Sequence, residues 1–124
     1  MRTIDISPED MAKRVSRFNE LNPLRAAESL DMPQEAKDII YSRELLSVIG
    51  LEGNADTPVN QGAPILGAGG ITMTHAKCPA GTGPSLHAHQ QTFETFTVLR
   101  GRFEVTWNDD GAQCGELGEF DTIA

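Results

Sequence analysis

Residues 81–101 of the chain read GTGPSLHAHQQTFETFTVLRG. This stretch holds two of the three histidines in the protein, His87 and His89, with one residue between them. On an extended strand, successive side chains alternate between the two faces, so both imidazoles would lie on one face, roughly 6 to 7 Å apart. The spacing therefore allows two neutral ring nitrogens to bind one metal ion.

Glu94 follows His89 by five residues and can supply a carboxylate to the same ion. Two imidazoles and one carboxylate form a mixed nitrogen and oxygen donor set, which suits a divalent transition metal such as Fe, Mn, Ni, Cu or Zn. We expect His87, His89 and Glu94 to be the metal ligands. His75 is the one other histidine in the chain, and its place in an alternating pattern favours an ordinary strand residue.

The same stretch resembles the first sequence motif of the cupin family. That motif has a glycine, five residues, His-x-His, three or four residues, a glutamate, six residues and a glycine. Its positions are filled here by Gly81, His87, His89, Glu94 and Gly101. The resemblance implies a small double-sheet β-barrel (a jelly roll) with a metal inside, bound by the two histidines, the glutamate and a histidine of a second motif.

The start of a second cupin motif falls at residues 118–123, but residue 124 is Ala124 where the motif has proline. The resemblance therefore places the fourth ligand beyond Ala124 and the last barrel strands outside this sequence. Three interpretations stay open, of which we favour the first: the chain is a fragment, a second chain supplies the missing strands, or the barrel is unusually small.

Alternating apolar and polar residues after Gly70 predict a series of short strands. In the strand expected at 92–99, Glu94, Phe96 and Val98 lie on one face, so Phe96 and Val98 would line a pocket beside the metal, with Gln91 near it. The other expected strands and the turn are 71–77, 103–107, the hairpin turn 108–111, 112–116 and 120–124. Four or five strands at short spacing indicate an all-β barrel or sandwich. With the cupin resemblance, the expected fold class is an all-β barrel with an N-terminal helical extension.

The first half of the chain is less regular. Ser7 and Pro8 suit the start of a helix, and an apolar repeat at Met11, Val15 and Phe18 predicts that the helix continues to residue 21. A short helix is expected at 34–41. Residues 42–51 could extend this helix or form a strand, of which we favour a strand at 45–51. A Gly- and Pro-rich loop is expected at 52–70, with a brief extended piece at 65–66. This gives an extension (1–51), a loop (52–70) and a barrel (71–124).

Composition restricts the partners. The chain has 124 residues, a net charge of -8 and a pI near 4.7, which argues against binding to nucleic acid or to anionic membranes. No apolar run reaches the roughly 18 residues that a membrane span needs, and the N-terminus has no secretory signal core. Two cysteines do not make a disulfide framework, so we expect a cytoplasmic protein with reduced thiols.

Three functions are consistent with this reading. The favoured one is a metal-dependent oxidoreductase of dioxygenase type that acts on a small organic compound, because small cupins resembling this chain include such enzymes. The alternatives are a non-catalytic ligand-binding or sensory module with a structural metal, and a cupin isomerase or decarboxylase. The resemblance also implies a homodimer.

Overall fold

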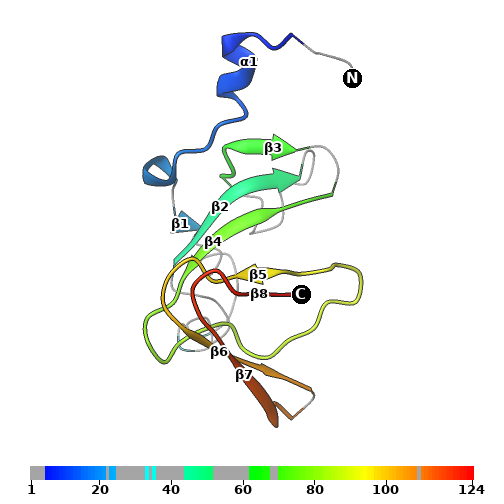
Figure 1. Ribbon diagram of the computed structural model, residues 1–124. Coiled ribbons are helices and arrows are strands. Elements are labelled where there is room, and N and C mark those ends of the chain that lie inside the picture. The colour runs from blue at the N-terminus through cyan, green and yellow to red at the C-terminus, as the bar shows by residue number, and fades with distance from the viewer. Residues whose placement is uncertain are drawn as a thin grey trace. The chain divides into compact units, whose positions relative to one another are not determined.

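The computed structural model describes residues 5–21, 23–24, 33, 35, 44–51, 62–67, 70–108 and 110–124. These residues are rich in short strands (Figure 1). The helical elements are α1 (Pro8–Ala12) and the 3-10 helix η1 (Phe18–Glu20). The strands are β1 (Pro23–Leu24), β2 (Glu44–Leu51), β3 (Ile65–Gly67), β4 (Met73–Lys77), β5 (Phe96–Thr97), β6 (Phe103–Trp107), β7 (Gln113–Leu117) and β8 (Thr122–Ile123).

The chain divides into two compact units, Met1–Pro84 and Ser85–Ala124. The boundary falls inside the segment 71–124, for which the sequence predicts a single barrel. Each unit has its own strand pairs: β1 to β4 form one sheet in the first unit, whereas β5 pairs with β8 and β6 pairs with β7 in the second.

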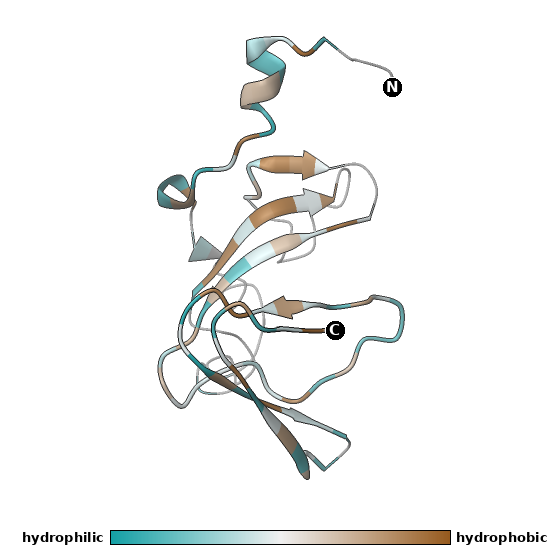
Figure 2. Cartoon of the chain, viewed as in Figure 1, coloured by the Kyte–Doolittle hydropathy of each residue, from teal (hydrophilic) through white to brown (hydrophobic). Residues whose placement is uncertain are grey.

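Strand β2 organises the first unit. It pairs antiparallel with β1 and β4 and parallel with β3 (Figure 1). Its apolar residues give it the brown colour of Figure 2, and Leu46, Ser47 and Val48 are 2%, 2% and 8% exposed. Because successive side chains point to opposite faces of a strand, three consecutive buried residues mean that both faces of β2 are covered. The predicted strand at 45–51 is confirmed.

A β-bulge interrupts the pairing of β2 with β4. Ser47 is opposite Thr74 and Ile49 is opposite Met73, so Val48 is the extra residue on β2. An extra residue bends a strand and increases its twist locally. Glu44 and Lys77 are opposite one another in this pairing, and Lys77 Nζ lies 3.1 Å from Glu44 Oε2.

The N-terminal helix is much shorter than the sequence predicts. Ser7 is its N-cap, and its Oγ accepts a hydrogen bond from the Asp10 backbone N–H, as expected. The helix nevertheless ends at Ala12, and η1 alone adds helical structure before residue 21. Neither element buries a residue. A 15-residue helix in water depends on packing of its apolar face, and Met11 and Val15 remain 47% and 45% exposed. The predicted helical extension is therefore wrong.

Phe18, the third member of the predicted apolar stripe, does contact the sheet. Its ring meets the ring of His75 edge to face, with centroids 5.5 Å apart, and Lys77 Nζ lies 5.3 Å from the centre of the Phe18 ring. His75 and Lys77 are two residues apart on β4, so both point to the face on which Phe18 lies.

A hairpin of β6 and β7 forms part of the second unit. The two strands pair antiparallel from Phe103 opposite Leu117 to Trp107 opposite Gln113. In the turn between them, the Gly111 N–H donates to the Asn108 carbonyl at 3.0 Å, and both residues have positive φ. Gly115 lies against the Trp107 ring, where an added Cβ would be 3.4 Å from a ring carbon. The predicted strands at 103–107 and 112–116 and the turn between them are confirmed.

Strands β5 and β8 pair through two residues each. The pairing continues past the strands, because the Val98 N–H donates to the Asp121 carbonyl and the Phe120 N–H donates to the Val98 carbonyl. Phe120 is third in the turn 118–121 and has a φ of 70°, a conformation that favours glycine. Val98 is 6% exposed and is the buried apolar residue of this unit among those that the structure describes.

The predicted all-β barrel is contradicted. Over the described ranges, the strands form one four-stranded sheet and two pairs, and no sheet closes on itself. A closed barrel requires each strand to pair on both edges, whereas β5 and β8 are two residues long and pair only with one another. What is observed is a β-rich chain with separate small sheets.

Some sequence expectations fall on residues outside the description. The predicted helix at 34–41 has only Glu35 described, and residues 52–61 and 68–69 of the predicted loop also lie outside. The described part of that loop contains β3, at the expected brief extended piece. In the part of the chain that the structure describes, no helix has the length and apolar character that crossing a membrane requires.

Candidate metal centre

The candidate metal ligands lie in the irregular segment 78–95, which connects the end of β4 to the start of β5. A tight turn at 79–82 opens this segment. The Thr82 N–H donates to the Pro79 carbonyl at 3.0 Å, and Gly81 at the third position of the turn has a φ of 77°. Glycine adopts this conformation without steric cost, which gives a local reason for the residue type at the first position of the cupin-like motif.

The last glycine of that motif also has positive φ. Gly101 has a φ of 88° in the turn between β5 and β6, and its backbone N–H donates to Glu119 Oε1 at 3.1 Å. Two positions of the motif thus need glycine for the shape of the backbone, independently of any metal.

The imidazole of His87 is oriented by the backbone. Its Nδ1 lies 2.7 Å from the Ser85 carbonyl oxygen. A carbonyl only accepts hydrogen bonds, so Nδ1 carries the proton. A neutral imidazole has one N–H, and the lone pair of His87 is therefore on Nε2. Contacts of this kind fix the tautomer of metal-binding histidines.

Glu94 brings the two histidines together. Its Oε2 atom lies 3.1 Å from His89 Nε2 and 3.5 Å from His87 Nε2. The two imidazole rings meet edge to face, with centroids 5.0 Å apart and planes at 89°. One nitrogen or oxygen from each of the three residues lies within 4.8 Å of the others. The structure thus brings together all three predicted ligands.

The arrangement differs from the one that the sequence predicts. Neither histidine lies on a strand, and Glu94 precedes β5 instead of lying in a strand at 92–99. Short-range contacts replace the strand geometry: the Ser85 carbonyl orients His87, and Glu94 Oε2 contacts both rings. Sequence reasoning missed Ser85, because a backbone carbonyl carries no signature of residue type.

The distances suit a divalent transition metal. With bonds of about 2.1 Å, two ligand atoms are about 3.0 Å apart at an octahedral angle and about 3.4 Å apart at a tetrahedral angle. Of the two distances from Glu94 Oε2, 3.1 Å lies inside this range and 3.5 Å lies just above it. The side chains are 42% to 43% exposed, so an ion bound here would keep coordination positions open to solvent. The donor set and its spacing therefore fit the predicted cofactor.

No other group of three potential metal ligands occurs among the described residues. Of the predicted pocket residues, Gln91 is exposed, Phe96 is 46% exposed and Val98 is buried. The pocket that they would form beside the metal stays a prediction. His75, the remaining histidine, contacts Phe18.

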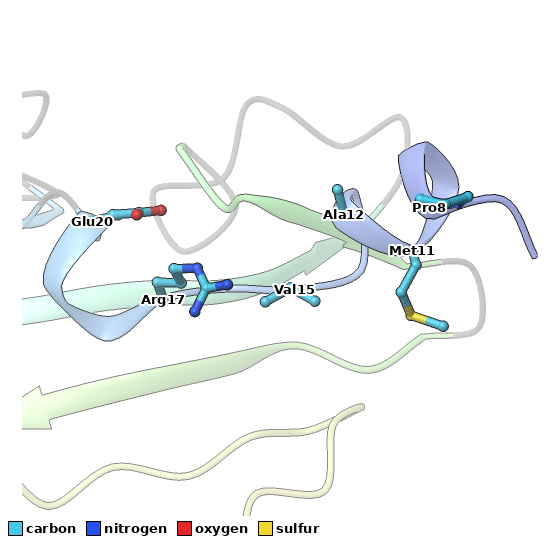
Figure 3. A pocket seen from close by; sticks show the side chains of 6 residues that line it. All are labelled: Pro8, Met11, Ala12, Val15, Arg17 and Glu20. Carbon is cyan, nitrogen blue, oxygen red and sulfur yellow. The ribbon is translucent and has the colours of Figure 1, made fainter.

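The structure has a hollow at a different place, beside α1 (Figure 3). The side chains around it come from α1 and from the following segment through η1. They are Pro8, Met11, Ala12, Val15, Arg17 and Glu20. Glu20 is the one potential metal ligand in this set, so the hollow offers no second metal site.

No protein-family model, curated protein sequence or solved structure matches this chain. The resemblance to the cupin motif therefore depends on five residues, Gly81, His87, His89, Glu94 and Gly101.

Proposed function

We propose that this chain binds one divalent transition metal ion through His87 Nε2, His89 Nε2 and Glu94 Oε2. One observation carries the proposal: Glu94 Oε2 lies 3.1 Å from His89 Nε2 and 3.5 Å from His87 Nε2, while His87 Nδ1 is committed to the Ser85 carbonyl. In a neutral His87 ring the lone pair on Nε2 and the carboxylate oxygen repel one another, and a cation between them, either a proton or a metal ion, offsets this repulsion. A metal ion can accept electron pairs from both His87 Nε2 and Glu94 Oε2. It can also accept one from His89 Nε2 once the proton of that ring is on Nδ1.

The donor set supports an activity of dioxygenase type on a small organic compound. Two histidines and one carboxylate with open positions are the ligands of non-haem iron oxygenases. A metal held this way supplies open positions at which dioxygen or a chelating substrate can bind. His87 and His89 hold the ion without changing its charge, and Glu94 lowers the net charge of a divalent centre to about +1.

Two further expectations belong to this proposal. The acidic charge and the small number of cysteines support a cytoplasmic location, and the resemblance to small cupins supports a homodimer. Fractionation of the native host and mass photometry of the purified protein would test them.

Titration with Co²⁺ tests the metal site directly. We expect ligand-field absorption bands that saturate at about one ion per chain, and loss of these bands in His87→Ala and in His89→Ala. His75→Ala is the matched control: it removes a histidine outside the cluster and should saturate like the parent. Identical titrations of all four proteins would refute the proposed ligands.

Oxygen uptake tests the activity separately. The Fe²⁺-loaded parent would be assayed with small phenols and diketones, beside Glu94→Gln under the same conditions. Uptake by the parent alone is the expected result. Equal uptake by both proteins across the set would remove the dioxygenase assignment and leave the metal site in place.

A further inference from the structure

We infer that the metal also sets the conformation of the segment that binds it. This inference rests on the proposed function and concerns residues 83–95, which we call the metal loop. All three ligands lie between residues 87 and 94 of this loop, within eight residues of one another in sequence. An ion bound by them would close a short ring inside the loop.

Backbone hydrogen bonds do not hold the metal loop. The turn before it ends with the bond from the Thr82 N–H to the Pro79 carbonyl, and the next backbone pairing begins at Phe96 in β5. Between these points, no backbone group of the fully described residues 83–95 bonds to another backbone group. The two hydrogen bonds in the loop are made by ligand side chains: His87 with the Ser85 carbonyl and His89 with Glu94.

Burial does not hold the loop either. Gly83 and Ser85 are half-buried, every other residue of the loop is exposed, and Phe93 is 85% exposed. Fixing the backbone of one residue costs at least as much free energy as one hydrogen bond typically contributes. Two bonds therefore cannot hold this many residues in one conformation.

The metal supplies the missing constraint. Three coordinate bonds join His87, His89 and Glu94, and part of the binding free energy is spent on ordering the chain between them. The metal-free and metal-bound proteins would thus differ in the metal loop: many conformations without the ion, and one with it. Binding of the ion becomes a local conformational switch next to β5.

Limited chymotrypsin digestion tests this switch, with Zn²⁺ as the ion because it has no redox chemistry. Phe93 lies in the metal loop, and Phe120 is an internal control, since it is 76% exposed in a turn outside the loop. Saturating Zn²⁺ should slow cleavage after Phe93 by at least about 10-fold and leave cleavage after Phe120 unchanged. Native mass spectrometry of the same samples would report the bound Zn²⁺.

Two variants complete the experiment. His89→Ala removes a ligand and should show no Zn²⁺ protection at Phe93, whereas Thr92→Ala changes a non-ligand in the same loop and should be protected like the parent. Bound Zn²⁺ without protection, or with equal protection at Phe93 and Phe120, would overturn the switch and leave the site intact. Absence of bound Zn²⁺ in the parent would overturn both.

Discussion

Glu94 is the residue on which the proposed site depends most, because its Oε2 atom contacts both imidazoles. Glu94→Gln keeps the size of the side chain and removes its charge. We predict that metal binding weakens by at least about 10-fold, since even partners outside the coordination sphere change affinity by 10 to 100-fold. Calorimetric titration with Zn²⁺ would measure it.

The matched control is Glu104→Gln on β6, an exposed glutamate outside the cluster. It makes the same change in charge and should bind Zn²⁺ like the parent. If both variants lose affinity equally, the net charge of the protein determines binding and Glu94 is not a ligand.

Phe120 adopts a backbone conformation that suits glycine. Its φ is 70° and its side chain is 76% exposed, so the left-handed conformation is not offset by burial. Phe120→Gly should therefore raise the free energy of unfolding by about 1 kcal/mol. Urea denaturation would measure the change. Phe93→Gly, at an exposed phenylalanine without positive φ, should not stabilise the protein, and equal stabilisation by both variants would contradict the explanation.

At the scale of single residues, the sequence identifies candidate metal ligands better than it predicts backbone conformations. The ligands could be found because histidine and glutamate at this spacing have few other uses together. The Ser85 carbonyl could not be found, because every residue has a carbonyl. Gly81 and Gly101 have positive φ, which glycine adopts readily. Phe120 has positive φ although phenylalanine disfavours it, so residue preference does not predict the conformation of Phe120.

Among the elements, α1 offers a prediction of pH dependence. The pKa of the Asp10 carboxyl lies below its usual value, first because Ser7 Oγ–H donates to it and then because Lys13 is close. A lowered pKa means that the carboxylate form supports the folded helix. Its contribution is therefore present above the ordinary pKa of aspartate and is lost as the pH falls through the lowered value.

Ser7→Ala should raise the pKa of Asp10 toward its usual range, because the largest cause of the shift is removed. NMR titration of the Asp10 side-chain carboxyl carbon would show it. Ser16→Ala, which removes a hydroxyl without a hydrogen-bond partner, is the control and should leave the titration of Asp10 unchanged. A pKa of Asp10 that is equal in the parent and in Ser7→Ala would contradict the assigned cause.

The strands that could be predicted are those with apolar alternation or an apolar run, together with β7, which follows the hairpin turn signal at 108–111. β2, β4, β6 and β7 fall where the pattern places them, with ends shifted by one or two residues. β5 is shorter than its pattern, because Glu94 and the residues before it lack a pairing partner. The helix predicted to residue 21 ends at Ala12, because an apolar stripe forms a long helix only when another element covers it.

For the whole molecule, the metal should stabilise the folded state by mass action. An ion at 100 times its dissociation constant adds about 2.7 kcal/mol when it binds only the folded protein. Thermal unfolding should therefore shift upward with Zn²⁺ in the parent and saturate. The same titration should leave the midpoint of His87→Ala unchanged. An equal shift in both proteins would mean that Zn²⁺ binds elsewhere.

The overall architecture was the least predictable level. The sequence predicts a barrel from a resemblance that covers residues 81–101, whereas several observed pairings join residues distant in sequence. β5 pairs with β8 across 25 residues at Thr97 and Thr122, and β2 pairs in parallel with β3. Local alternation identifies a strand but not its partner, and the short irregular segment between His87 and Glu94 brings the ligands together without a barrel.

Native mass spectrometry of the parent and of the double variant His87→Ala, His89→Ala is the most direct test of the central claim. After reconstitution with Fe²⁺, Mn²⁺, Ni²⁺, Cu²⁺ and Zn²⁺ in turn, the parent should carry about one ion of at least one metal per chain. The double variant should carry none. A parent that carries no ion with any of these metals, or a double variant that carries the same ion as the parent, would contradict the proposed metal site.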